Sequence, residues 1–226
     1  MCRNNQLEYI FSEKELYPRA RELFFLMAGF SEKNPPSIYQ EEEIFLVQQA
    51  IASKLHIVME AKKIQHYEFY SRYMILEEER FEYNIPLQSY KEQITGVYAY
   101  FVSSKEIDIT EQNVARQLYG DIWQNAYLDA AREASREMLR LYTGHVVSQG
   151  MAPGFYGIPV ENISNLFRLL DTKRAGITLE EGGYMKPEKT VMGIYFTLRW
   201  DLNIFKRDCS NCFAKGKNCE FCMRKL

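Results

Sequence analysis

Apolar side chains near the start of the chain recur every three or four residues, which is the spacing of one helical face. Ser12 and Glu15 stand three apart, as in a capping box, so the sequence predicts that a first helix begins there and stops at Gly29. Its inward stripe is Leu16, Ala20, Leu23 and Met27. After residues 34–36, which include two prolines, a second helix is predicted from about Tyr39. Its stripe is Ile44, Val47, Ile51, Leu55 and Val58.

The pattern then changes to the two-residue alternation of half-buried strands. Residues 62–73 are predicted to form one such strand, and residues 81–85 repeat the pattern in a second. Residues 95–104 are apolar almost without interruption, so we expect a strand that is buried on both faces. Residues 190–198 predict a final strand.

Two further helices are predicted in the second half of the chain. Asp108 and Glu111 have cap spacing ahead of a long helix, which Gly120 is expected to kink. The inward stripe of this helix is Trp123, Tyr127, Ala130, Ala134 and Met138. A short helix opens at Pro159 and places Ile163, Leu166, Phe167 and Leu170 on one side. Because helices and strands are segregated, the sequence predicts an α+β fold with a mainly antiparallel, twisted sheet and flanking helices.

Composition and charge narrow the class of protein. The 226 residues are 46% hydrophobic and 26% charged, which is enough material for one good core and a small appendage. A net charge of -2 leaves no broad basic face, so nucleic acid is not expected as a partner. The first residues offer no apolar export signal and no stretch is long enough to span a bilayer, so we expect a cytoplasmic protein without a membrane partner.

Four cysteines close the chain in two C-x-x-C pairs, Cys209 with Cys212 and Cys219 with Cys222. This spacing allows four thiolates to converge on one metal, either zinc or an iron-sulfur cluster, and spacing alone does not separate the two. Two disulfides or free thiols are the other interpretations. We therefore divide the chain into a domain over residues 1–200 and a metal-binding tail over residues 201–226.

Two segments rich in glycine and proline interrupt the regular elements. We call residues 152–158 the first bend and residues 180–187 the second bend. Pro153, Gly154 and Gly157 predict a tight loop ahead of the short helix, while Gly182-Gly183 and Pro187 interrupt the approach to the last strand. Glycines allow a ligand or partner to approach the backbone closely.

The sequence around both bends resembles the activation domain of cobalamin-dependent methionine synthase, and more closely its short standalone relatives. That domain has a Pro-Gly-Tyr loop before a helix ending in Leu-Phe-x-Leu-Leu, and a Leu-Thr-Glu-Ser-x-x-Met-x-Pro segment before a Ser-Val-x-Gly strand. The corresponding segments here, in the same order and at similar spacing, are residues 152–155, 166–170, 179–187 and 190–193. The similarity is specific from about residue 117 to residue 198.

In methionine synthase this domain lies against the corrin when the cobalt is inactive and supplies S-adenosylmethionine for its repair. The resemblance therefore implies a role in corrinoid reactivation. The cofactor-binding residues that it implies here are Pro153, Gly154, Phe155, Tyr156, Glu181, Tyr184 and Met185. The chain departs from the family at an arginine, which falls on Gly150, and at two tyrosines, which fall on Phe155 and Gly183.

None of His56, His66 and His145 lies in the Asp-x-His-x-x-Gly setting of a cobalt ligand, so the cobalamin is expected on a partner. That partner would be a corrinoid-binding protein or a methyltransferase, with an electron donor protein as a further partner. Three hypotheses follow. The chain is a redox accessory that docks on the corrinoid protein and helps reactivate it, a methyl donor that uses S-adenosylmethionine, or a non-catalytic corrinoid- or protein-binding module with structural zinc.

Overall fold

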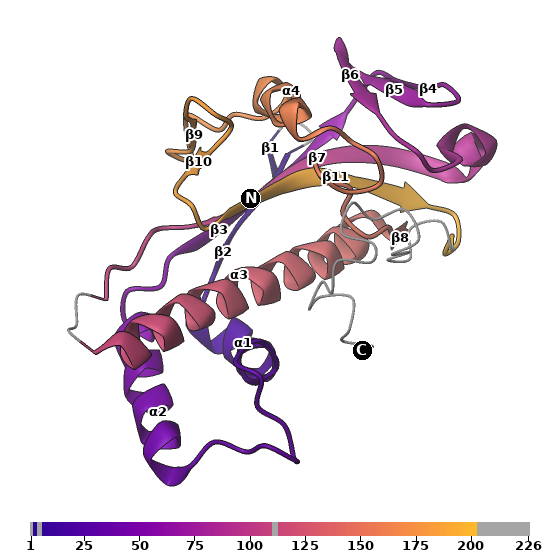
Figure 1. Cartoon of the computed structure of the whole chain (residues 1–226). Helices are drawn as coiled ribbons and strands as arrows, with labels where there is room; N and C mark the ends of the chain where they lie inside the picture. Colours follow the sequence, from indigo (N-terminus) through magenta and orange to yellow (C-terminus); the bar gives the residue numbers. More distant parts are fainter. Residues whose placement is uncertain (1, 4–5, 110–112, 203–226) are drawn as a thin grey trace.

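The computed structural model describes residues 2–3, 6–109 and 113–202. Its centre is an antiparallel sheet in the order β1-β2-β3-β7-β11-β8, in which β7 and β11 pair along nearly their whole length (Figure 1). The strands of this sheet are β1 (Cys2–Arg3), β2 (Gln6–Phe11), β3 (Ile57–Ile64), β7 (Ile94–Ser104), β8 (Val146–Val147) and β11 (Thr190–Leu198).

Three long helices cover one face of this sheet, which we call the helix face. They are α1 (Glu13–Met27), α2 (Ile38–Ala52) and α3 (Val114–Thr143). The helix α3 lies along the sheet, while α1 and α2 pack on α3 (Figure 1). Phe24 stacks on Trp123 with ring centroids 4.2 Å apart, and both side chains lie in the apolar cluster between helices and sheet.

Shorter elements cover the opposite face, which we call the α4 face (Figure 1). They surround a second apolar cluster, which also takes in alternate side chains of β7 and β11. These elements are β4 (Tyr67–Phe69), β5 (Tyr73–Leu76), β6 (Glu79–Glu82), the 3-10 helices η1 (Leu87–Gln93) and η2 (Val160–Asn162), α4 (Ile163–Leu169), β9 (Thr178–Leu179) and β10 (Met185–Lys186).

The predicted fold class is confirmed: the protein is α+β with an antiparallel sheet and flanking helices. The strand predicted over residues 95–104 is β7, and it is buried on both sides as expected. Tyr98 and Tyr100 belong to the cluster on the helix face, while Val97 and Ala99 belong to the cluster on the α4 face. The capping box that starts α1 is also confirmed, because both Ser12 and Glu15 make the reciprocal hydrogen bonds.

The predicted second helix is too long. The helix α2 ends at Ala52, and Val58, which we assigned to the helical stripe, lies in strand β3. Strand β3 pairs with β2 on one side and with β7 on the other, so two ladders of hydrogen bonds override a helical spacing that was coincidental. Strand β2 itself was not predicted.

The single strand predicted over residues 62–73 is also wrong. The chain leaves β3 at Ile64, forms β4, and turns back into β5 at Tyr73. The Tyr70 N–H donates to the Tyr73 carbonyl at 2.8 Å, which closes a two-residue turn at the C-terminal end of the predicted strand. The aromatic alternation therefore spans a hairpin.

Helix α3 differs from the prediction at its start and at Gly120. Its N-cap is Asn113, whose side chain accepts from the N–H groups of Ala115 and Arg116, so the cap assigned to Asp108 and Glu111 is wrong. The helix runs through Gly120 without interruption. A Cβ atom at this position would lie 2.1 Å from the Ile109 side chain, so the glycine permits close packing.

Two further predictions concern the cysteine tail and membrane-spanning helices. Cys209, Cys212, Cys219 and Cys222 lie outside the described residues, so the metal-binding tail and the domain boundary at residue 200 stay predictions. Within the described part of the chain, no helix is long and apolar enough to cross a membrane.

Candidate functional site

The first bend connects the edge of the central sheet to the segment that leads into α4. Met151 exchanges backbone hydrogen bonds with Ile194 of β11, at 2.9 and 2.7 Å, which fixes where the bend starts. The Gly154 N–H then donates to the Ile158 carbonyl at 2.8 Å and closes the loop. Phe155 lies at its tip with 61% of its surface exposed. A large aromatic side chain is thus held in solvent by a hydrogen-bonded loop.

Gly157 attaches the first bend to the segment before η1. The Asn84 N–H donates to the Tyr156 carbonyl at 2.8 Å. Gly157 has a φ of 78°, and a Cβ there would lie 2.7 Å from Asn84 Cγ. Both the backbone angle and the close approach therefore require glycine, so the loop is fixed in place by packing and backbone hydrogen bonding.

The second bend contains the tip of the β9–β10 hairpin, followed by β10 and Pro187. The Glu180 N–H donates to the Tyr184 carbonyl at 2.7 Å, and the Gly183 N–H donates to the Glu180 carbonyl at 3.1 Å. Gly182 and Gly183 have φ values of 89° and 86°, which glycine adopts without strain. Glu181 and Tyr184 are exposed, the tyrosine by 73%. The hairpin therefore presents one carboxylate and one aromatic ring to solvent.

Short contacts after this hairpin connect it to the sheet and to α3. The Thr190 hydroxyl donates to the Pro187 carbonyl at 2.7 Å and contacts the Ser103 hydroxyl of β7 at 2.8 Å. The Lys189 ammonium donates to Asp121 and Asn125 of α3. These hydrogen bonds therefore attach the end of the second bend to the central sheet and to helix α3.

Both bends lie on the α4 face and share one support. Tyr156 and Ile158 of the first bend, together with Ile177 and Met185 around the second, pack on the same apolar cluster as Leu166 of α4. In Figure 1 the β9–β10 hairpin and the loop that leads from β8 to α4 lie on either side of α4. The structure thus brings the buried parts of both bends into one cluster and leaves Phe155, Glu181 and Tyr184 at the surface.

Gly150, which corresponds to an arginine in the activation domain that the sequence resembles, packs against a tyrosine. A Cβ atom at Gly150 would lie 2.3 Å from the Tyr100 hydroxyl oxygen, and one at Gly193 would lie 3.1 Å from it. The Tyr100 ring stacks on Tyr195 with centroids 3.9 Å apart. The space at these two glycines is therefore filled by Tyr100, which explains in packing terms why residue 150 has no side chain. The sequence alone gave no signal that Tyr100 packs against Gly150.

The buried tyrosine pair is suited to packing rather than to proton transfer. Burial raises the pKa of Tyr100 well above its ordinary value, and burial also raises the pKa of Tyr195. The Tyr195 hydroxyl donates to the Arg132 carbonyl at 3.3 Å. Both hydroxyls stay neutral at physiological pH, so neither supplies a base to the α4 face.

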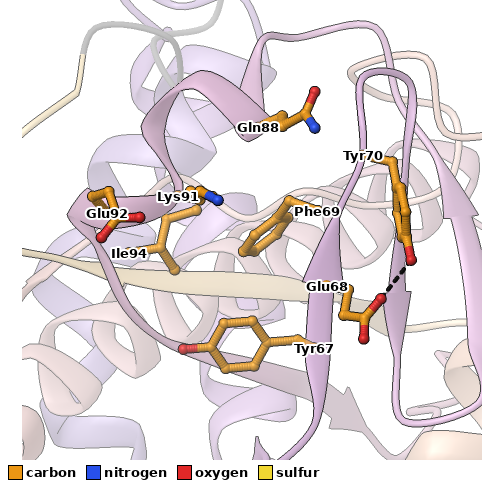
Figure 2. A pocket seen from close by; sticks show the side chains of 8 residues that line it. All are labelled: Tyr67, Glu68, Phe69, Tyr70, Gln88, Lys91, Glu92 and Ile94. Atoms are coloured by element: carbon orange, nitrogen blue, oxygen red, sulfur yellow. Dashed lines mark hydrogen bonds between the residues drawn. The ribbon is translucent and has the colours of Figure 1, made fainter.

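A surface hollow of about 420 Å³ lies between strand β4 and helix η1. Figure 2 shows the rings of Tyr67 and Phe69 along one side and Lys91 and Ile94 on the other. Phe69 also contacts Phe196 of β11, with ring centroids 6.0 Å apart. None of the predicted site residues lines this hollow, although the alternation of Tyr67 and Phe69 in the sequence had marked them as half-buried.

A buried carboxylate in strand β3, beneath the loop after α4, was not predicted. Glu60 of β3 is 2% exposed, and its Oε2 accepts from Arg174 at 3.1 Å. Arg174 also pairs with Glu8 and so ties the loop after α4 to the strands below it. Burial raises the pKa of Glu60, and the contact with Arg174 opposes that rise. The available signal in the sequence was a glutamate that directly follows the three apolar residues 57–59.

The described residues form no candidate metal centre. They contain no group of three or more His, Cys, Asp or Glu side chains that could hold an ion. The four predicted cysteine ligands lie outside this part of the chain.

Comparisons with known proteins add one finding about the fold. No protein-family model matches the chain, and no curated protein matches it. A crystal structure of the MetH reactivation domain bound to AdoHcy is similar, with a TM-score of 0.67 and 14% sequence identity. The similarity covers 87% of this chain and 79% of that one. The protein therefore has the fold of the MetH reactivation domain.

Proposed function

We propose that the protein docks on a separate corrinoid protein and supports its reductive reactivation or methyl transfer. The observation that carries this proposal is the pair of bends on a fold like that of the MetH reactivation domain. Each bend lies where the sequence resembles the activation domain, and each exposes an aromatic ring, Phe155 or Tyr184. Large exposed aromatic side chains on fixed loops are typical of binding surfaces.

A corrinoid offers a broad, flat and largely apolar surface to such rings. Covering Phe155 in a complex would contribute about 1.5 to 3 kcal/mol, if most of its exposed surface leaves water. Glu181 adds one carboxylate that can accept hydrogen bonds from the amide groups at the edge of a corrin. The cobalamin would arrive on the partner, because none of the three histidines of this chain lies in a cobalt-binding motif.

A binding measurement tests the proposal. Calorimetry would follow the titration of a cobalamin-loaded corrinoid protein into the chain, with the cobalt in its inactive, oxidised state. Phe155→Asp should weaken binding at least about tenfold, because the ring is lost and a charge is desolvated. Leu141→Asp is the matched control, since Leu141 is an exposed apolar residue near the C-terminal end of α3, outside both bends. Equal binding by wild type and Phe155→Asp would show that the first bend is not the docking surface.

The second candidate is a methyl donor that uses S-adenosylmethionine, because the similar structure is bound to AdoHcy. The closed space at Gly150 weighs against it, since no side chain there can pair with a carboxylate. Calorimetry with S-adenosylmethionine decides the matter: binding heat that Glu181→Gln reduces would favour the methyl donor. No heat at high ligand concentration would exclude it.

The tail with Cys209, Cys212, Cys219 and Cys222 fits either an iron-sulfur relay for this reaction or structural zinc. Iron and sulfide in anaerobically purified protein, with visible charge-transfer absorbance, would favour the redox accessory. Zinc would favour the non-catalytic module. The double variant Cys209→Ser/Cys219→Ser should lose the metal, and full metal content in that variant would rule out a four-thiolate site.

A further inference from the structure

A pocket of about 260 Å³ lies between helices α1 and α2, and α3 also contributes to it. The α1 residues that line it are spaced four apart and so share one side of that helix. They are Tyr17, Arg21 and Phe25. The other lining residues are Glu41, Ile44, Phe45 and Gln48 of α2 and Trp123 of α3. None of the residues of the two bends lines this pocket.

The buried polar atoms of the pocket already have partners. Trp123 is 2% exposed, and its Nε1 donates to the Ile44 carbonyl at 3.2 Å. Gln48 is also 2% exposed, and both its amide nitrogen and its side-chain oxygen are hydrogen-bonded. The Tyr17 ring stacks beside Trp123, with centroids 6.2 Å apart. The inner part of the pocket therefore favours an apolar group, which needs no hydrogen bond.

The outer part carries two opposite charges, one on each of the two helices. Arg21 of α1 and Glu41 of α2 are both exposed. The Arg21 guanidinium carbon lies 4.9 Å from the centroid of the Phe25 ring, which leaves its N–H groups available at the edge of the guanidinium plane. Among the described residues, neither charged group has an ion-pair partner. Both charges are therefore available to a ligand.

The size of the pocket limits the ligand. A cavity of about 150 Å³ can hold benzene, whereas drug-sized ligands occupy pockets of about 300 Å³ or more. The pocket between α1 and α2 lies between these sizes, so it admits one ring or one branched chain with a small polar head. A head with a single charge would meet a like charge at either Arg21 or Glu41, so a head that carries both charges fits best.

We propose that this pocket binds a free α-amino acid with a large apolar side chain. That side chain lies against Trp123 and covers Phe45, which is 57% exposed without a ligand. The ligand carboxylate accepts from Arg21, and its ammonium group donates to Glu41. The pocket lies on the helix face and both bends lie on the α4 face, so the inference does not depend on the proposed function (Figure 1).

Fluorescence with L-phenylalanine as the probe tests this proposal. The chain has two tryptophans, so in the full chain with Trp200→Phe the tryptophan emission comes from Trp123. L-phenylalanine should change this emission saturably, with a dissociation constant below about 1 mM. Phenylalaninamide lacks the carboxylate and N-acetylphenylalanine lacks the ammonium group, so each should bind at least about tenfold more weakly. No saturable change with L-phenylalanine or L-leucine up to about 10 mM would overturn the proposal.

Two variants test the contacts with the ligand. Arg21→Met should weaken binding of L-phenylalanine at least about tenfold and leave that of phenylalaninamide unchanged, because the amide has no carboxylate for Arg21. Glu41→Gln should weaken L-phenylalanine similarly and leave N-acetylphenylalanine unchanged. Glu42→Gln is the matched control, since Glu42 is exposed on α2 but does not line the pocket, and it should bind like the parent chain.

Two results would contradict this assignment. If Arg21→Met and Glu41→Gln bind L-phenylalanine as tightly as the parent chain, the ligand does not lie between these two charges. If N-acetylphenylalanine binds as tightly as L-phenylalanine, the pocket recognises an aromatic carboxylate, and the proposal of an amino acid is wrong.

Discussion

The two faces of the central sheet are built in different ways. On the helix face three helices of fifteen or more residues pack through large rings, such as Trp123 on Phe24. On the α4 face the elements are short, and the chain changes direction repeatedly through glycines with positive φ. Those glycines are Gly154, Gly157, Gly176, Gly182 and Gly183, whereas on the helix face positive φ occurs at Gly29 and Gly144, just after helices.

Under the proposed function, this difference separates the residues that stabilise the fold from those that bind the partner. Long helices bury large apolar side chains and leave little backbone exposed, so they supply a rigid support. Fixed loops on the opposite face can present Phe155 and Tyr184 without contributing much to the core. If this is right, substitutions on the helix face should change the free energy of unfolding, and substitutions at the bends should change binding.

The largest expected effect lies on the helix face. Trp123→Ala should lower the free energy of unfolding by about 3 to 5 kcal/mol, because it leaves a cavity and removes the hydrogen bond from Nε1 to the Ile44 carbonyl. Urea denaturation followed by circular dichroism measures this. The chain has one other tryptophan, and Trp200→Ala should change stability by less than about 0.5 kcal/mol because Trp200 is exposed. Similar losses in both variants would contradict the comparison.

The sequence predicted the helix face better than the α4 face. Helical spacing and a capping box are local signals, so α1 and α3 could be located from Ser12 and from the stripe through Trp123. The end of α2 could not, because β3 is defined by pairing with strands that are distant in the sequence. The bends were located from their glycines and prolines, and a family resemblance then suggested their role. The packing of Tyr100 against Gly150 joins residues that are distant in the sequence, so no local pattern encodes it.

The second prediction tests the packing of Tyr100 against Gly150. Gly150→Ala should lower the free energy of unfolding by about 1 to 3 kcal/mol, because its Cβ would overlap the Tyr100 hydroxyl. Adding Tyr100→Phe removes the hydroxyl and should recover part of the loss. The two changes should therefore be less than additive in a double-mutant cycle. Strict additivity would show that Tyr100 does not fill the space at Gly150.

The third prediction compares one buried glutamate on each face. Burial raises the pKa of Glu60, so the native state binds a proton more readily than the unfolded state, and this contribution to stability is lost as pH rises above 4.5. Hydrogen bonds from Arg116 lower the pKa of Glu43, so its contribution is present above pH 4.5 and is lost as pH falls.

Opposite pH dependences should follow for the two Gln variants. Relative to wild type, Glu60→Gln should gain stability as pH rises from below 4.5 to neutral, whereas Glu43→Gln should lose it. Urea denaturation at several pH values, with the same buffer ions throughout, measures both slopes. Slopes of the same sign would mean that one of the two carboxylates is not in the environment described.

The smallest expected change in stability is at the second bend. A substitution there is informative because an effect on binding can be separated from an effect on folding. Tyr184 is 73% exposed, and its backbone carbonyl, which accepts from Glu180, is kept in any variant. Tyr184→Ala should therefore change the free energy of unfolding by less than about 0.5 kcal/mol. If Tyr184 nevertheless contributes to docking on a corrinoid protein, the same variant should weaken that binding in calorimetry. A loss of stability above about 2 kcal/mol would instead make the tyrosine part of the core, and the division between a supporting face and a recognition face would fail.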